Sequence, residues 1–482
     1  MSYLSLKSPC RVVWVLLCLC LAGRALAQAA TNTRPSVVQE PLPIPLPEAA
    51  NPYANTPELT NELSTESGLT NQPLATATAP PLLGPRTGGG DQLASPVMGT
   101  SVIGGPAAAS GFATPSGPPL LKWGPVDVHA SMFYSLVYGN GIQATPGEQG
   151  KTFINTISPG LTLNLGTHWV LSYNPSYAVY SNPNFRNTLS ESALVSGNTT
   201  YGDWSFRLSQ SYAYTDTPLV ETGKQTTEEA YATVLGATYQ MSGQCSLQAL
   251  ANQNFRFTDL FDNLEEWTGS LWLDDQIIPQ LRLGLGLTGG YDDLSVGSSM
   301  PFEMVQGRIT FNPGAKLSLA LSGGVEESEF VHPSAPSLLN PTFSASLIYR
   351  PLPNTSLNLT ASRSVTPSFY ANEIEVVTGV NALIRQQLSP KFSLSLLASY
   401  SSQPLTSIEP APLPQFFLGP PPLRALTVVE NNNYTSVSVT LSYAVISRGI
   451  LSVFYTSSDN SSGQANFKYS STQVGVSANY RY

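Results

Sequence analysis

Charged side chains are scarce in this sequence. Asp, Glu, Lys and Arg make up 11% of its 482 residues, whereas soluble domains carry about 25%. Apolar residues do not take their place, because the mean hydropathy is only −0.02; uncharged polar residues do. This balance disfavours an ordinary soluble domain. It is typical of strands that face lipid on one side and water on the other.

Cysteine, histidine and basic charge are also in short supply. Only Cys245 lies beyond the first 27 residues, and the three histidines, His129, His168 and His332, are far apart. Protein metal sites are built from closely spaced ligands of these types, so we expect neither a metal nor another cofactor. The formal net charge is −9. Nucleic acid is not an expected partner, because domains that bind it carry basic surfaces.

No apolar run is long enough for a transmembrane helix, which takes about 20 residues. The longest run, Val12 to Ala22, follows Lys7 and Arg11 and precedes Ala25-Leu26-Ala27. A basic start, a short apolar run and a small-residue cleavage site form a secretory signal peptide. We therefore expect residues 1–27 to be a signal peptide that is removed on export.

Residues 28–122 lack a regular hydrophobic period and are rich in proline, alanine and glycine, as at Pro41, Pro43 and Pro45. Such a segment buries too little apolar surface to offset the entropy that it loses on ordering. We predict a disordered periplasmic arm. A plug folded inside a barrel is the alternative.

From residue 123 onward, apolar and polar residues alternate. At the end of the chain Val474, Val476, Ala478 and Tyr480 step up to Tyr482 with polar residues or glycine between them. A period of two is typical of a β-strand with one apolar and one polar face. Similar runs begin at Val126, Leu161, Trp169, Trp204, Leu281, Leu317, Leu357, Phe392 and Val437.

The connections between these runs are alternately short and long. Eight short ones carry turn residues, as in Gly166-Thr167, and nine longer ones separate them, which gives about eighteen strands within a range of sixteen to twenty. Outer-membrane barrels have short periplasmic turns and longer outer loops. We predict an all-β fold over residues 123–482, a transmembrane antiparallel up-and-down β-barrel. Its N-terminal arm and C-terminus are expected in the periplasm.

A sheet embedded in lipid must close on itself, because unpaired backbone groups are costly in hydrocarbon. The expected barrel meets outer-membrane lipid with its apolar face, and aromatic side chains at strand ends form interfacial girdles. The expected girdle residues are Tyr134, Tyr138, Trp169, Tyr239, Tyr291, Tyr349 and Tyr400. Tyr480 and Tyr482 on the terminal strand resemble the signal that the barrel-assembly machinery reads.

The alternation also assigns side chains to the barrel interior. The residues expected to line the lumen are Asp127, His129, Asp203, Arg207, Arg256, Glu266, Asp274, Arg282 and Arg308. Rings of fixed charge select among solutes, but charges on neighbouring strands also pair and brace a wall, and both roles stay open. The longest connection, 402–433, either constricts the lumen or contacts another barrel or an export partner.

The stretch "GLGLTGG" holds Gly284, Gly286 and Gly289 in the spacing of a nucleotide-binding loop. That motif requires a strand, a turn and then a helix, whereas these glycines lie within a run of alternating leucines. We interpret them as lumen-facing positions of one strand and expect no nucleotide.

Several strand and loop segments resemble a known family. They include "INTISPGLTLNLGTHWVLSYNPSYAVYS", "GAKLSLALSGGVEESEF" and "PTFSASLIYRPLPNTSLNLTASRSV". Over roughly Val126 to Tyr482 the order of these segments is similar to the β-barrel porin families of Gram-negative outer membranes. The resemblance implies an outer-membrane location, and some members of these families are associated with exopolysaccharide export.

The first functional hypothesis is therefore a porin-like channel for hydrophilic solutes. The alternative is an accessory barrel of an exopolysaccharide export or cell-surface assembly system, with export components as partners. An outer-membrane hydrolase would need a Ser/His pair on the outer wall. Because His129 is expected to face inward, we do not expect an enzyme.

Overall fold

The structure is a computed structural model that describes residues 119–482, apart from residue 146 and the segments 217–224, 296–298, 332–333, 369–372, 410–424 and 464–467. The expected signal peptide and the expected arm up to residue 118 lie outside the described residues. None of the described segments is a helix long and apolar enough to span a membrane.

Nineteen strands make up the regular structure of the described residues. The first ten are β1 (Leu121–Trp123), β2 (Val126–Thr145), β3 (Glu148–Leu165), β4 (Trp169–Tyr180), β5 (Thr188–Tyr201), β6 (Trp204–Thr215), β7 (Glu228–Gln240), β8 (Cys245–Thr258), β9 (Leu264–Ile278) and β10 (Leu281–Leu294). The others are β11 (Met300–Gly314), β12 (Leu317–Val331), β13 (Ser334–Leu352), β14 (Thr355–Pro367), β15 (Glu373–Gln387), β16 (Phe392–Glu409), β17 (Ala425–Ile446), β18 (Gly449–Ser461) and β19 (Tyr469–Arg481).

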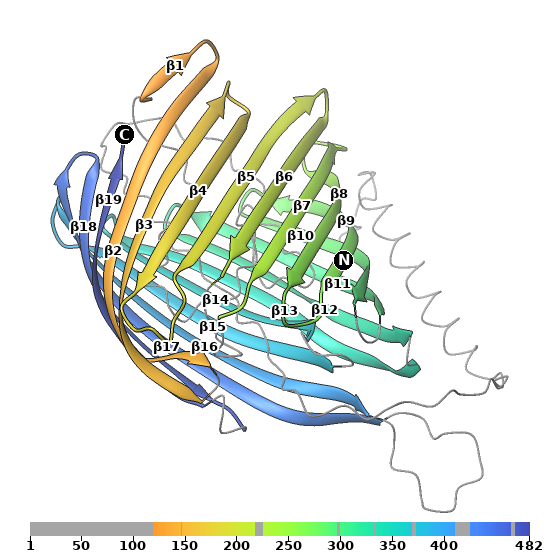
Figure 1. Cartoon of the computed structure of the whole chain (residues 1–482). Coiled ribbons are helices and arrows are strands. Elements are labelled where there is room, and N and C mark those ends of the chain that lie inside the picture. Colours follow the sequence, from red (N-terminus) through yellow and green to blue (C-terminus); the bar gives the residue numbers. More distant parts are fainter. Residues whose placement is uncertain are drawn as a thin grey trace, which may run out of the picture.

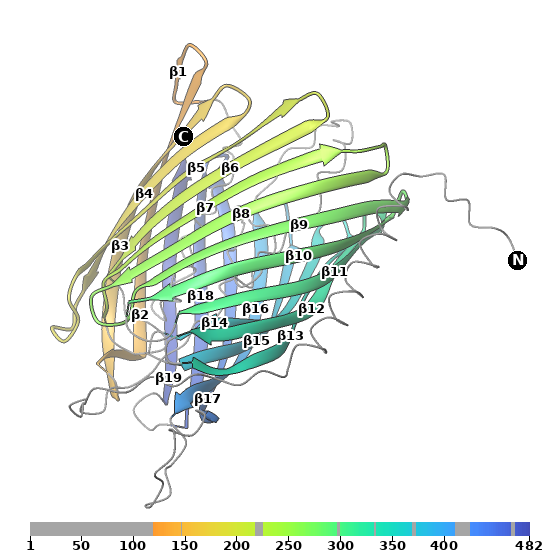
Figure 2. The same ribbon diagram turned by 90° about the vertical axis from the view of Figure 1, so that its right-hand side faces the viewer.

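Strands β2 to β19 close into one antiparallel ring (Figure 1). Each pairs with the next along the chain, and β19 returns to β2, with Thr472 opposite Asn140 and Arg481 opposite Ser131. Figure 2 shows the same ring from the side, with its strands inclined. The eighteen-stranded up-and-down barrel predicted from the alternation is confirmed.

The expected sorting of connections is also present, but the strands are longer than predicted at the long-loop end. Strand β2 continues to Thr145 and strand β3 begins at Glu148, so the two strands fill most of the loop expected over 139–150. Strands β12 and β13 likewise fill most of the loop expected over 327–340. Cross-strand backbone bonds continue here although the alternation is interrupted, because Ile142 and Gln143 are both buried next to a register shift between β2 and β3. The middle of the 402–433 connection lies outside the described residues.

The two faces of the ring differ in polarity. The outer face carries exposed apolar side chains such as Leu271 and Val453, which are 55% and 53% exposed. Aromatic residues of the expected girdles also lie there, including Tyr134, Tyr291 and Tyr400. A closed sheet has no free edge along the ring, so an apolar band surrounds the barrel without exposing unpaired strand edges.

The short strand β1 forms a hairpin with the start of β2. Leu121 lies opposite Val128, and Gly124 allows the tight turn with a φ of +60°. Strand β19 pairs with the same edge of β2 from Ser131 onward, and just beyond this pairing the Tyr482 amide donates to the Ala130 carbonyl over 2.8 Å. Strand β1 therefore continues the line of β19 at the short-turn end of the barrel (Figure 1).

Candidate functional site on the inner wall

Burial distinguishes the inner face of each strand from the outer one. Along β9, Glu266, Trp272 and Asp274 are buried, while the intervening Trp267 and Leu271 are exposed. Buried residues of the inner face come from neighbouring strands that lie in register, so they form a continuous wall around the interior. This inner wall is the part of the barrel that any solute inside it would meet.

The side chains expected in the lumen lie at different depths in this wall. Five of them are buried: His129, Arg256, Glu266, Asp274 and Arg308. Three are partly exposed: Asp127, Arg207 and Arg282. Asp203 is exposed and occupies the two-residue turn between β5 and β6 rather than a strand. Two of the set have partners close in the sequence. Asp127 lies 3.5 Å from the Lys122 ammonium, and Glu266 accepts a hydrogen bond from the side-chain amide of Asn254 over 3.3 Å.

Arg308 forms the centre of a polar cluster near the middle of β11. Its Nε donates to Asp274 Oδ1 over 2.7 Å, and its Nη2 donates to Asp274 Oδ2 and, over 3.0 Å, to Gln248 Oε1. The guanidinium carbon also lies 4.3 Å from the centroid of the Trp272 ring. A bidentate ion pair and a cation–π contact hold this charge in one geometry.

Strand β10 passes beneath this cluster, and its glycines make the cluster fit. A Cβ atom on Gly286 would lie 2.5 Å from the Trp272 ring, and one on Gly284 would lie 2.6 Å from Arg308 Cγ. The indole and the arginine therefore lie flat across β10 instead of projecting into the barrel. Gly284 and Gly286 thus have a packing cause, because side chains from β9 and β11 cover the bare backbone of β10 there. Gly289 was expected to face the lumen as well, but it is exposed and lies on the same face as the outward Tyr291.

The sequence placed Arg308 and Asp274 on the inner face, but it did not indicate their pairing or the parts played by Gln248 and Trp272. The partners come from strands β8, β9 and β11, so the ion pair skips over β10. The one available signal was the pair of glycines in β10, which marks a place where neighbouring side chains approach the backbone closely.

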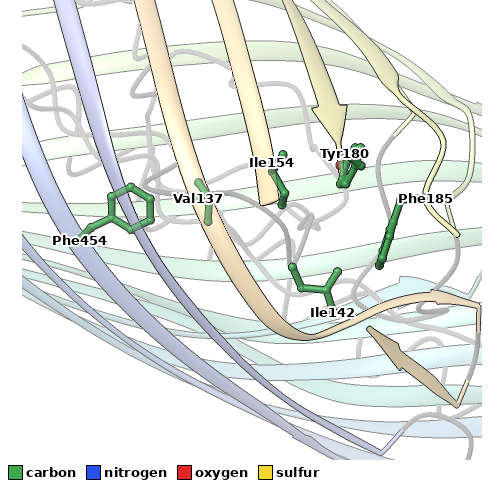
Figure 3. Close-up of a cluster of buried hydrophobic side chains, with 6 residues drawn as sticks. All are labelled: Val137, Ile142, Ile154, Tyr180, Phe185 and Phe454. Carbon is green, nitrogen blue, oxygen red and sulfur yellow. The ribbon is translucent and has the colours of Figure 1, made fainter. Parts of the chain in front are cut away.

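A second inner-wall group is apolar and lies toward the long-loop end (Figure 3). Its buried members are Val137, Ile142, Ile154, Tyr180, Phe185 and Phe454. Tyr180 and Phe185 stack with ring centroids 5.4 Å apart. Phe185 belongs to the connection between β4 and β5, so this loop folds against the inner wall. A constriction was expected only from the 402–433 connection, and this inward loop was not predicted.

Polar bonds hold the β4–β5 loop to its neighbour. The Arg186 guanidinium lies 2.9 Å from Asp216 Oδ1. The Gln225 side chain accepts from the Arg186 amide over 2.7 Å and donates to the Arg186 carbonyl over 2.8 Å. Because backbone and side chain are both engaged, Phe185 is held at the inner wall on a fixed support.

Asp262 lies in the connection between β8 and β9 and makes the stability of this β8–β9 loop depend on pH. Its Oδ2 is buried without a hydrogen-bond partner among the described residues, and burial raises the pKa of this carboxyl to about 6. The usual pKa is about 3.9, so the closed loop binds this proton more tightly than the open chain. Its stability is therefore highest below about pH 4 and falls as the pH rises to about 6.

We expect Asp262→Asn to abolish this pH dependence. Exchange rates of the Phe261 and Asn263 amides, corrected for the intrinsic rate at each pH, measure loop opening. Wild type should open more readily at pH 7 than at pH 4, whereas the variant should not. The same pH slope in both proteins would contradict the assignment to Asp262.

Comparison with known proteins gives likeness to solved barrels only. No protein-family model matches the sequence, and no curated protein matches it. The FrpB iron transporter of Neisseria meningitidis (F3-3 variant) is 11% identical, with 70% of this chain and 62% of that chain covered and a TM-score of 0.40. OpdK of Pseudomonas aeruginosa, solved with vanillate, is 9% identical over 74% of this chain and 99% of that one, with a TM-score of 0.41.

OccK2 (OpdF) of Pseudomonas aeruginosa is 10% identical over 74% of this chain and 98% of that one, with a TM-score of 0.42. The chain spans only 62% of the length of the iron transporter. At these scores and identities none of the three structures indicates a function for this chain. The resemblance to porin families therefore stays a prediction from the sequence.

Proposed function

We propose that this chain is an outer-membrane channel for small hydrophilic solutes. The observation that carries the proposal is the closed ring of β2 to β19, apolar on its outer face and polar over much of its inner wall. Lipid solvates an apolar circumference of this kind, and closure leaves no backbone group unpaired in hydrocarbon. A barrel of this strand number is wide enough to enclose an aqueous path.

The inner wall gives this channel two different surfaces. At mid-height Arg308 is paired with Asp274, so the ion pair contributes dipoles and hydrogen-bonding groups rather than net charge. Toward the long-loop end the apolar cluster around Phe185 offers no hydrogen bonds to a solute. Neutral polar solutes are therefore expected to pass more readily than ions, because neither surface compensates an ion for lost hydration.

Single-channel recording of refolded protein in a planar bilayer tests the proposal. We expect stepwise conductance from wild type. Phe185→Ala should raise the size of each step, because it removes an aromatic ring from the inner wall. The matched control is Leu271→Ala, which trims an exposed side chain of the outer face and should leave the step unchanged.

Absence of conductance from a folded, inserted barrel would overturn the channel proposal. The accessory role in exopolysaccharide export would then be the remaining candidate, and it rests on the sequence resemblance. Normal polysaccharide secretion by a deletion strain would remove that candidate too.

We also propose that the short-turn end lies in the periplasm and that the barrel-assembly machinery reads the terminal strand. In support, the aromatic rings of Tyr480 and Tyr482 are exposed at that end. Outer-membrane barrels place their short turns in the periplasm. Unchanged assembly in cells of a chain that lacks Tyr482 would contradict the role of the terminal residue.

A further inference from the structure

Basic side chains gather along one half of the short-turn end of the barrel. The four hairpins β11–β12, β13–β14, β15–β16 and β17–β18 contribute one basic residue each to this group. Strands β19 and β1 contribute the other two. This set, the basic rim, consists of Lys122, Lys316, Arg350, Lys391, Arg448 and Arg481. Lys316, Lys391 and Arg448 lie in the turns themselves, and Arg350 lies two residues before the end of β13. Arg481 ends β19, and Lys122 on β1 is paired with Asp127.

Backbone bonds connect members of the basic rim around the ring. The Arg350 amide donates to the Lys316 carbonyl over 2.7 Å, and the Arg481 amide donates to the Arg448 carbonyl over 2.9 Å. Between these pairs, the Ala444 amide donates to the Lys391 carbonyl over 2.8 Å. The cations thus lie on neighbouring strand ends and turns of one edge of the ring instead of on unrelated loops.

The other half of the short-turn end, where the described turns run from β3–β4 to β9–β10, does not share this basic character. The four turns from β3–β4 to β9–β10, all of them described, hold no lysine or arginine, and one of them carries Asp203. At the long-loop end the outer face is acidic, with Glu265 directly opposite Asp293 and Glu303 directly opposite Glu327. The basic rim is therefore a local feature in a chain whose net charge is −9.

Apolar and aromatic side chains accompany the cations. Leu352, Leu388 and Ile446, from the same hairpins, are 57%, 58% and 55% exposed. Trp123 on β1 is 79% exposed. The Arg448 guanidinium lies 5.0 Å from the centroid of the Tyr482 ring at the end of the chain. Exposed apolar groups that alternate with cations at one level are typical of the boundary between hydrocarbon and headgroups.

We propose that the basic rim binds the phosphate-bearing headgroups of anionic phospholipids in the leaflet at the short-turn end. The inference rests on the proposed membrane location of the barrel. Lipid is the occupant that fits, because the turn cations Lys316, Lys391 and Arg448 lie on or beside hairpins whose apolar side chains are exposed on the circumference. A headgroup layer meets all of these hairpins at once. The acidic long-loop end gives the opposite leaflet no comparable site for anionic lipid.

The test compares two double variants of the full chain refolded into phosphatidylcholine vesicles that contain phosphatidylglycerol. Lys316→Gln with Lys391→Gln removes two exposed cations of the basic rim. Lys151→Gln with Lys468→Gln removes two exposed cations at the long-loop end. Electron spin resonance of spin-labelled lipids measures how strongly the barrel surface prefers phosphatidylglycerol over phosphatidylcholine.

We expect wild type to prefer phosphatidylglycerol about two-fold, since a basic side chain beside an anionic surface strengthens association by up to about five-fold at single sites. The rim variant should show a clearly smaller preference, because two of the six cations are gone, and the long-loop variant should match wild type. In 1 M NaCl the preference should disappear, because charges are then screened within about 3 Å.

Parity in wild type, an equal loss in both variants, or full preference in the rim variant would each overturn the proposal. The last outcome would leave the basic rim to a soluble protein partner. The proposed channel fails in a different way, by the absence of conductance. A chain that does not insert at all, recognised by an unchanged gel mobility on heating, overturns both.

Discussion

Replacing Asp274 by alanine is expected to lower the free energy of unfolding by about 3–5 kcal/mol, the cost of leaving a buried charge without its partner. Arg308 and Asp274 have side chains that are only 9% and 4% exposed, and two of the three Arg308 hydrogen bonds described above go to this carboxylate. Urea unfolding of the protein in lipid vesicles, followed by tryptophan fluorescence, measures the change.

Two control variants separate burial from charge. Arg308→Met together with Asp274→Leu removes both charges and is expected to be close to wild type in stability, because the pair then leaves nothing uncompensated. Lys122→Gln breaks the exposed pair with Asp127 and should change stability by less than about 1 kcal/mol. A loss below about 1 kcal/mol in Asp274→Ala would mean that Gln248 or water replaces the carboxylate.

The second large effect concerns Trp272, which is 2% exposed and lies across Gly286. Trp272→Ala should cost about 3–5 kcal/mol through lost burial and the cavity that it leaves. Gly286→Ala alone should cost about 1–3 kcal/mol, because its new methyl group would overlap the indole. With Trp272 already replaced, Gly286→Ala should be neutral or stabilising, since alanine orders a strand at lower entropic cost than glycine.

This pair forms a double-mutant cycle with an expected coupling of about 1–3 kcal/mol. Gly269→Ala is the matched control, because a Cβ atom there would meet nothing within 4 Å. Unfolding of the four proteins of the cycle and of the control gives the coupling. Additive effects of Trp272→Ala and Gly286→Ala would show that the ring does not depend on the bare backbone of β10.

The sequence predicted the ring closely because the two faces of each strand meet different surroundings. Leu281, Leu283 and Leu285 alternate with Arg282 and Gly284 along the first half of strand β10. The prediction fails beyond Asn140, where β2 continues as a hairpin with β3. There Ile142 and Gln143 are both buried next to register shifts in the hairpin, so the period of two is broken before the strand ends.

The candidate site was predictable residue by residue but not as an assembly. Alternation placed Arg308 and Asp274 on the inner face, yet their contact depends on register across a third strand. The inward position of Phe185 depends on bonds between Arg186, Asp216 and Gln225, from two separate loops. Such contacts arise from tertiary packing, and the alternation of polar and apolar residues along the sequence does not predict them.

The shared edge of β2 limits how the barrel can close. Strand β1 reaches this edge through a tight turn, so the β1–β2 hairpin forms locally and early, whereas β19 must travel from the far end of the sequence. Once β1 occupies the edge opposite Val126 to Val128, β19 cannot slip two residues further without displacing it. A slip of two would keep every side chain on its proper face, so alternation alone does not prevent it. The three-residue strand thus serves as a stop against this slip of β19 along β2.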